Sequence, residues 1–455
     1  MGTNSQRRPN QVDPQRRLGV PAPAHARSLV RSDEARALAA STLCLFAILA
    51  AHYVLKSLRS FVLQTHIGVD RKSVALVISA ASVAVQTNVY SRIVTRTTRL
   101  RLVTGTFALM LASLVAFALA YSHGGNRVLG YLFYAWVSGA SLLLVSQFWS
   151  VATEAWTHEQ GLRLFGIIGI GAVAGSIGGN LLVIGLGGKL GLGGLFALAA
   201  ALLLSALVLA RWLLHWSGAD AKASLAAERR ANPVTAASLV AAPPYLAGIA
   251  VMSLLLNVVN TSNEWGLDKT VAATALAGHE LPAFYGRDML EQNVLTFALQ
   301  VAATSPIQRK FGPRAALLVL PTISVLGGLA FVLAPSLGVV RTLKVAENAA
   351  EYSIHANTRE LLYDPVTSLE RYNAKSFNDT FVVRAGDSLA AGAIFFVVEW
   401  LGAGLGRSAV TLIAVLGVVL ATVTRHVIWR VTGRHRAQVE AASARDESPV
   451  HLPAK

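Results

Sequence analysis

The stretch from Arg341 to Asp387 reads RTLKVAENAAEYSIHANTRELLYDPVTSLERYNAKSFNDTFVVRAGD, and it decides both the fold and the kind of site to look for. Its charged residues crowd into segments that otherwise have the apolar character of membrane-spanning helices. A charge at the centre of a bilayer costs about 2.5–3.5 kcal/mol, even on insertion scales that give low costs. These residues are therefore expected to face each other or a water-filled path inside a helical bundle.

Helical phasing divides the charges of this stretch into groups. At roughly 100° per residue, one face of the first helix carries a polar stripe. The stripe consists of Arg341, Lys344, Glu347, Asn348, Glu351, His355 and Arg359. Two interpretations remain open: the stripe lines or gates a pathway, or it is an internal ion-pair ladder that locks this helix to its neighbours.

In the second helix, Lys375 and Asp379 share one face, whereas Arg384 and Asp387 lie nearly opposite. No single polar face explains both pairs, so one pair is predicted at an entrance or gate and the other inside a cavity. A guanidinium group matches phosphate or carboxylate geometry, which makes Arg384 a candidate anion ligand. The alternative is that Arg384 pairs with Asp387.

The rest of the chain is strongly apolar. Its 455 residues are 54% hydrophobic and 14% charged, whereas a soluble domain carries about 25% charged residues. Continuous apolar runs are long enough to cross a bilayer as helices. The predicted spans are 38–63, 73–94, 101–121, 128–153, 163–187, 192–214, 244–265, 287–307, 314–334, 337–361, 376–401 and 408–431.

These spans predict an all-α membrane protein with about twelve transmembrane helices in two six-helix bundles, the plan of major-facilitator-type carriers. Connections rich in Lys and Arg alternate with poor ones, which favours cytoplasmic termini in a bacterial inner membrane. The connection at 266–286 is placed outside, with room for a short re-entrant or surface helix. The expected divisions are a disordered basic tail 1–36, bundles 37–215 and 244–431, a cytoplasmic linker 216–243 and a tail 432–455.

Other charges fall within or near the predicted spans. Lys56 and Arg59 stand three residues apart on one face of the first span and could receive an anionic substrate. Arg59 could instead snorkel to the outer interface. Glu154 and Glu264, one in each half, are candidate proton sites or counter-ions, unless they lie at the membrane interface.

Several function classes are disfavoured. The net charge of +16 is concentrated in tails and alternate loops, so it indicates membrane topology and no nucleic-acid partner. The single cysteine, Cys44, excludes an internal disulfide framework and a CxxC pair. Gly171, Gly175 and Gly179 indicate close helix packing, since no preceding strand or complete glycine motif accompanies them. No enzyme, metal or cofactor is expected.

The segment from Lys344 to Asp387 resembles the signature of the ATP/ADP translocase family of plastids and intracellular bacteria. The matching positions are Lys344, Glu347, Tyr352, Ser353, Arg359, Glu360, Tyr363, Pro365, Tyr372, Lys375, Asp379, Arg384, Gly386 and Asp387. A second match has Trp149, Glu159, Arg163 and Gly166 as its anchors. Arg59 stands at the family's basic position in the first span, while Ser60 replaces the usual Asp.

This resemblance implies a carrier that exchanges ATP for ADP or imports nucleotides with protons. It implies transport roles for Arg59, Glu154, Glu264 and Lys375. The expected function is therefore secondary transport of an organic anion, with a nucleotide as the candidate substrate. The alternatives are a carrier of the same fold for another metabolite or a drug, and a non-transporting membrane scaffold or sensor. The candidate substrate-binding residues are Lys56, Arg59, Glu154, Glu264, Lys344, Glu347, Glu351, Lys375, Asp379 and Arg384.

Overall fold

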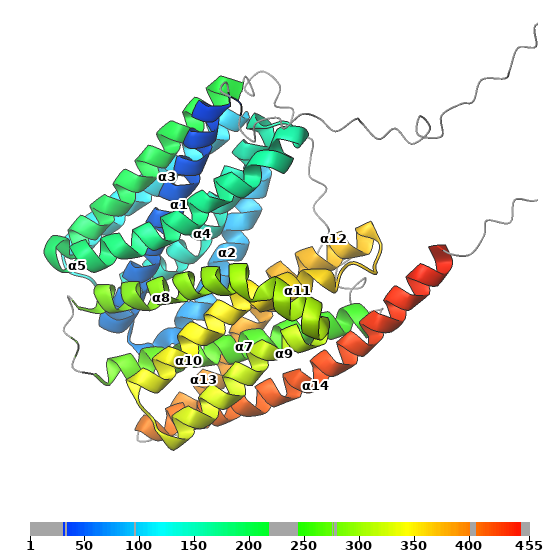
Figure 1. Ribbon diagram of the computed structural model, residues 1–455. Helices are drawn as coiled ribbons and strands as arrows, with labels where there is room; N and C mark the ends of the chain where they lie inside the picture. The colour runs from blue at the N-terminus through cyan, green and yellow to red at the C-terminus, as the bar shows by residue number, and fades with distance from the viewer. Residues whose placement is uncertain are drawn as a thin grey trace, which may run out of the picture.

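The computed structural model describes residues 31, 34–94, 97–217, 244–274, 276, 280–400 and 406–446. These residues form helices arranged in two bundles (Figure 1). The first bundle contains α1 (Ala35–Val62), η2 (Leu63–Ile67), η3 (Val69–Arg71), α2 (Lys72–Val94), α3 (Arg99–Ser122), α4 (Arg127–Ala155) and α5 (His158–Ser217). The predicted all-α class is thus confirmed for the described residues.

The second bundle starts at Pro244 and contains the charged stretch from Arg341 to Asp387. Its helices are α7 (Pro244–Ala272), α8 (Leu281–Ala302), α9 (Thr304–Leu333), α10 (Leu337–Ala350), η5 (Glu351–His355), α11 (Ala356–Leu361), α12 (Ser368–Phe377), η6 (Asn378–Val382), α13 (Val383–Trp400) and α14 (Gly406–Asp446). Both η5 and η6 are π-helical turns within longer helical segments. Such turns often occur at functional sites.

Membrane-spanning character is uneven along the described chain. Eight helices are long and apolar enough to cross a membrane. One of them, α5, divides at Gly191, where φ is 61°, a value that glycine adopts without steric cost. The division of α5 gives nine spans. Three further segments, namely α8, α10 through α11 and α12 through α13, bring the number of spans among the described residues to the predicted twelve. The charged stretch supplies two of these three polar segments.

The boundaries differ from the prediction in three places. The predicted connection 266–286 contains no separate helix among its described residues, because α7 continues to Ala272 and α8 begins at Leu281. The eleventh segment begins at Ser368, where Thr367 and Glu370 form a capping box. The last helix reaches Asp446 and so extends beyond the predicted end at 431. Most of the predicted first tail and linker lies outside the described residues.

Close packing of α1 on α5 organises the first bundle. Gly171, Gly175 and Gly179 place α5 directly against the backbone of α1. A methyl group added at Gly175 would lie 2.3 Å from the carbonyl oxygen of Phe46. The predicted glycine-mediated helix contact is therefore present. It fixes the orientation of α1, which carries Lys56 and Arg59.

The two bundles meet along α8 and α2. In Figure 1, α8 runs beside the first bundle, in agreement with its contacts to α1 and α5, and α13 contacts α2. An apolar cluster joins Val69 of η3 to Trp265 and Val271 of α7. We call this end of the interface the closed side, and the opposite end, where α1 begins and α14 ends, the terminal side.

Candidate functional site

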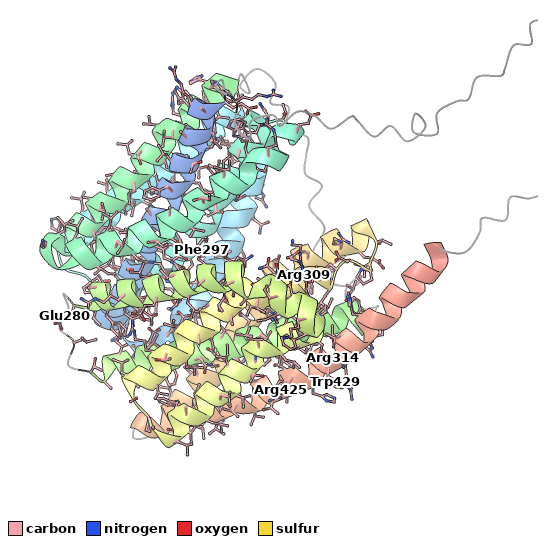
Figure 2. All side chains as sticks on the ribbon, viewed as in Figure 1. Glu280, Phe297, Arg309, Arg314, Arg425 and Trp429 are labelled. Carbon is pink, nitrogen blue, oxygen red and sulfur yellow. The ribbon has the colours of Figure 1, made fainter. Side chains whose placement is uncertain are left out.

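Two adjoining cavities lie between the bundles. The smaller cavity, of about 70 Å³, is lined by Lys56, Arg59, Ser60, Asn260, Glu264, Leu267, Asp268, Tyr285, Asp288, Met289, Gln292, Lys344, Asn348 and Tyr352. The larger, of about 660 Å³, shares Lys56, Gln292 and Tyr352 with it and extends along α8 to Gln300 and along α11 to Glu360. Figure 2 labels Phe297, another lining residue, on α8 where this helix faces the first bundle. We call the two together the central cavity.

The closed side is held by a buried lysine. Lys72, which is fully buried at the start of α2, lies 3.1 Å from Glu264 Oε1 and 2.5 Å from Asp268 Oδ2 on α7. Tyr285 donates a hydrogen bond of 2.7 Å to the other oxygen of Asp268. Because this ion pair crosses between the bundles, it fixes the closed side.

Further bonds between the bundles surround that lysine. Gln64 donates to the carbonyl oxygen of Asp268 at 2.9 Å, and Trp265 Nε1 donates to the carbonyl oxygen of Val69 at 3.3 Å. Lys269 forms an ion pair with Asp70 on the more exposed rim. Closure on this side therefore combines a buried ion pair, backbone acceptors and an apolar cluster.

Lys56 and Arg59 have a different environment from Lys72. Arg59 donates one hydrogen bond, of 3.3 Å, to Ser138 Oγ, and its guanidinium lies 4.8 Å from the centre of the Tyr134 ring. Lys56 Nζ lies 5.7 Å from the Tyr53 ring centre. Among the described residues, no carboxylate lies within salt-bridge distance of either cation. Two positive charges thus face the central cavity without a direct ion pair, in a lining that also contains Glu264, Asp268 and Asp288.

The second bundle satisfies its central charges internally. Lys344 donates to the carbonyl oxygen of Asn260 at 2.9 Å and also to the side-chain oxygen of the same residue. The amide of Asn260 donates to Glu351 Oε2 at 2.8 Å. Asn260 therefore links Lys344 in the central cavity to Glu351, which lines a separate cavity of about 90 Å³ with His355 and Arg359.

Glu347 lies behind the central cavity and does not line it. Its side chain is buried between α10, α7 and α9 and accepts hydrogen bonds from Asn263, at 2.7 Å, and from Ser324. The other carboxylate oxygen has no hydrogen-bond partner among the described residues. The predicted polar stripe is thus split between two cavities and a buried network.

Two predicted binding residues, Glu154 and Lys375, are held in ion pairs and do not themselves line the central cavity. Glu154 pairs with Arg99 of α3, and Lys375 pairs with Glu360 at 2.8 Å. These contacts lie toward the terminal side. The structure places the candidate binding residues Lys56, Arg59, Glu264 and Lys344 together, and places Glu154 and Lys375 elsewhere.

The two pairs of charged residues predicted on opposite faces of the eleventh segment, Lys375 with Asp379 and Arg384 with Asp387, have different partners in the structure. Asp379 lies 3.3 Å from Arg359 of α11, and Arg384 lies 3.1 Å from Asp387. Asp387 also accepts hydrogen bonds from Asn257 and Thr261 of α7. Of the two interpretations of Arg384, the structure shows the ion pair.

The terminal side has an ion pair where α1 and α5 begin. Glu34 precedes α1 and lies 2.9 Å from Arg163 of α5. Burial by itself would raise the pKa of Glu34, but hydrogen bonds from Gln160, Arg163 and the backbone of Arg31 outweigh it and lower that pKa below its ordinary value. Arg163, one of the residues on which the family resemblance rests, therefore connects the start of α5 to the start of α1 on the terminal side.

Several residues of the site were missed by the sequence analysis. Lys72 and Asp268 were assigned to connections, so their burial was not expected. Asp288 lines the cavity and lies 3.6 Å from Arg341, but it falls at the predicted edge of its span. Asn260 carries no charge and gave no signal. A useful signal would have been the pattern Asn260, Asn263, Glu264 and Asp268, since a helical wheel places polar groups there on one side of α7.

The fold is shared with solved structures of transporters of the major facilitator type. A bacterial homologue of the iron transporter ferroportin, in an inward-facing state, matches with a TM-score of 0.64 and 14% identity over 87% of this chain and 98% of its own. A bacterial homologue of the human lysosomal transporter Spinster, inward-facing and unoccupied, matches with a TM-score of 0.59 and 15% identity over 90% of this chain and 99% of its own.

The human organic anion transporter MFSD10 matches with a TM-score of 0.56 and 14% identity over 87% of this chain and 99% of its own. No protein-family model and no curated protein matches the sequence. At these identities, the likeness shows the fold, with two six-helix bundles, and leaves the chemistry of the cavity to be argued from its residues.

Proposed function

We propose that the protein is a secondary transporter that moves an organic anion by alternating access. The observation that carries this proposal is the pair Lys56 and Arg59, which face the central cavity without a carboxylate partner among the described residues. A cation in a membrane-embedded cavity is costly unless an anion neutralises it. A bound substrate with a negative group would provide that neutralisation.

A nucleotide is the candidate substrate. The larger cavity, at about 660 Å³, falls within the roughly 300–1,000 Å³ typical of small-molecule sites. Its lining combines the aromatic residues Tyr53, Phe297 and Tyr352 with the amides Gln292 and Asn293. Aromatic rings can stack on a base and amides can bind its edge, while Lys56 and Arg59 bind phosphate. The resemblance to ATP/ADP translocases points to the same substrate class.

The orientation that fits this function has the terminal side in the cytoplasm of a bacterial cell. The described state is then inward-facing, with the closed side toward the outside. The conformational change to the outward-facing state requires Lys72 to separate from Glu264 and Asp268. The side chain of Glu264 is 42% exposed and already lines the smaller cavity, so its carboxylate can approach Lys56 and Arg59 when substrate leaves.

Coupling would pass through Asn260. The amide binds Glu351 and the side-chain oxygen binds Lys344, so a proton on Glu351 would change the hydrogen bonds available to Lys344. Counter-exchange of two anions would need no such proton, because each substrate would neutralise Lys56 and Arg59 in turn. Both schemes use the same cavity, and they differ in their dependence on a pH gradient.

The test is uptake of labelled ATP into proteoliposomes loaded with ADP, with and without a pH gradient. Uptake above that of empty liposomes, lost in Arg59→Gln, supports nucleotide transport. If ATP is not taken up by correctly folded protein, the same vesicles are assayed with labelled dicarboxylates and sugar phosphates. Uptake of one of these would support the alternative, a carrier of another anionic metabolite, and no uptake of any anion would contradict the proposal.

A further inference from the structure

A second large cavity among the described residues lies outside the central cavity, on the surface of the first bundle. It has a volume of about 950 Å³ and lies between α2, α3 and α4. Its lining is mostly apolar, from Ile78 of α2 and Leu109 of α3 to Trp136 of α4. We call it the lateral groove. The transport scheme above does not use it.

The groove lies where the bundle is in contact with the bilayer. The large apolar side chains in its lining are highly exposed: Leu109 is 68% exposed, Val85 61% and Leu132 56%. Gly105, in the middle of the lining, has no atom within 4 Å of the position that a methyl group would occupy. Protein side chains therefore leave the groove unfilled, and in a membrane its apolar walls would be covered by hydrocarbon.

One end of the groove is basic. Arg101, at the start of α3, lines it on the terminal side and is exposed. Arg211 of α5 donates at 3.3 Å to Thr104, which lies one turn after Arg101 on α3. The lining contains no Asp or Glu residue. The groove thus combines apolar walls with an uncompensated positive end, where a negative headgroup would lie.

The dimensions agree with an acyl chain. From Arg101 to Phe117 the groove follows α3 for about 24 Å at 1.5 Å per residue, whereas the whole hydrocarbon core is about 30 Å thick. A lipid chain that starts at the headgroup level beside Arg101 can therefore lie along the groove for its whole length.

We infer that the lateral groove binds an anionic phospholipid of the leaflet on the terminal side, with its phosphate at Arg101 and an acyl chain along Gly105 and Leu109. A basic residue near a membrane surface favours an anionic headgroup by about 1 kcal/mol, so removal of Arg101 should weaken binding about fivefold. The apolar walls provide retention, and the charge provides headgroup preference.

The test is native mass spectrometry of the full-length protein released from nanodiscs that contain equal amounts of phosphatidylglycerol and phosphatidylcholine. We expect the wild type to retain one phosphatidylglycerol. Arg101→Gln should retain about fivefold less, and Gly105→Phe should lose the lipid because the new ring occupies the groove. Arg127→Gln, which changes an exposed arginine at the opposite end of the same bundle, is the matched control and should behave as the wild type.

Thermal unfolding in lipid-free detergent provides the control for folding. Gly105→Phe should keep the stability of the wild type there, since the added ring has free space. Equal retention of both lipids, equal retention by all variants, or a dimer whose second copy fills the groove would overturn the inference. None of these measurements requires a transported substrate, so their failure is distinguishable from failure of the proposed transport function.

Discussion

The two bundles handle charge in opposite ways. The second bundle contains most of the intramembrane charges. Among the described residues, Lys344 binds Asn260 and Arg384 binds Asp387 within this bundle. Glu264 and Asp268 instead bind Lys72 of the first bundle across the closed side. The first bundle has fewer, yet Lys56 and Arg59 face the central cavity with no carboxylate of the described residues within ion-pair distance, although Glu264, Asp268 and Asp288 line the same cavity. The dense charge pattern is thus bound internally, whereas the sparse pair is the proposed anion site.

The comparison extends to a third cation of the first bundle. Lys72 is buried like a structural charge and pairs with two carboxylates of α7. Lys56 and Arg59 are half-buried and pair with none among the described residues. The same residue class thus occurs in two different environments, and removal of each cation should have a distinct consequence.

The largest effect is expected for Lys72→Met. Removal of one partner of a buried ion pair leaves a buried carboxylate uncompensated, at a cost of about 3–5 kcal/mol. The closed side should open, or the protein should unfold at a lower temperature. Spin labels on Thr65→Cys and Ala273→Cys, in a chain whose native Cys44 is buried, would report the separation. An unchanged distance together with an unchanged melting temperature would contradict the role of this pair.

The next effect concerns the unpaired cations. Lys56→Gln with Arg59→Gln should reduce anion transport about 100-fold or more, since truncation of one partner of a desolvated charge pair costs about 2–5 kcal/mol. The melting temperature should change little, because no carboxylate loses its partner. Uptake assays and thermal unfolding of the same preparation separate the two outcomes. A strong loss of stability would show that both cations have structural partners.

A smaller effect is expected for Glu351→Gln. If Asn260 transmits protonation of Glu351 to Lys344, the variant should keep exchange of anions but lose stimulation by a pH gradient, by about tenfold for one lost charged hydrogen bond. Uptake with and without an imposed gradient measures this. Asp364→Asn, which affects the exposed ion pair with Arg371 outside the described cavities, is the matched control. Equal stimulation in both variants would remove Glu351 from the coupling scheme.

The smallest effect on stability is expected for Lys375→Gln. Its partner Glu360 and the lysine itself are 48% and 45% exposed, and an exposed ion pair contributes about 0–1 kcal/mol. The family resemblance gives Lys375 a transport role. Loss of transport without loss of stability would indicate that Lys375 acts in a conformation other than the described one. A drop in melting temperature comparable to that of Lys72→Met would instead show that Lys375 is structural.

Much of the fold could be predicted from the sequence, because long apolar runs and the basic connections are local signals. The close approach of α1 and α5 followed from Gly171, Gly175 and Gly179. The end of α7 and the start of α8 were misplaced because the charged residues Asp268, Lys269 and Glu280 interrupt the apolar runs there. The first two are accommodated in α7 since Asp268 pairs with Lys72 and Lys269 with Asp70.

The site could be predicted in part. Lys56, Arg59, Glu264 and Lys344 converge as candidate binding residues, although nothing in a single sequence shows which charges neutralise one another. That depends on distances between helices. The polar stripe also gave no single lining face, because Glu347 of α10 lies in a buried network and the π-helical η5 changes the direction of the side chains that follow. Asn260 was missed since an uncharged amide acquires its importance only through its two partners.

The central claim is that Lys56 and Arg59 bind the anionic group of the substrate. The most direct measurement is thermal stabilisation of the purified protein by a panel of ATP, ADP, sugar phosphates and dicarboxylates, compared among wild type, Lys56→Gln, Arg59→Gln and Lys375→Gln. The account predicts stabilisation of the wild type and Lys375→Gln by at least one anion, and its loss in Lys56→Gln and Arg59→Gln. Equal stabilisation of all four proteins by the same anion would contradict it.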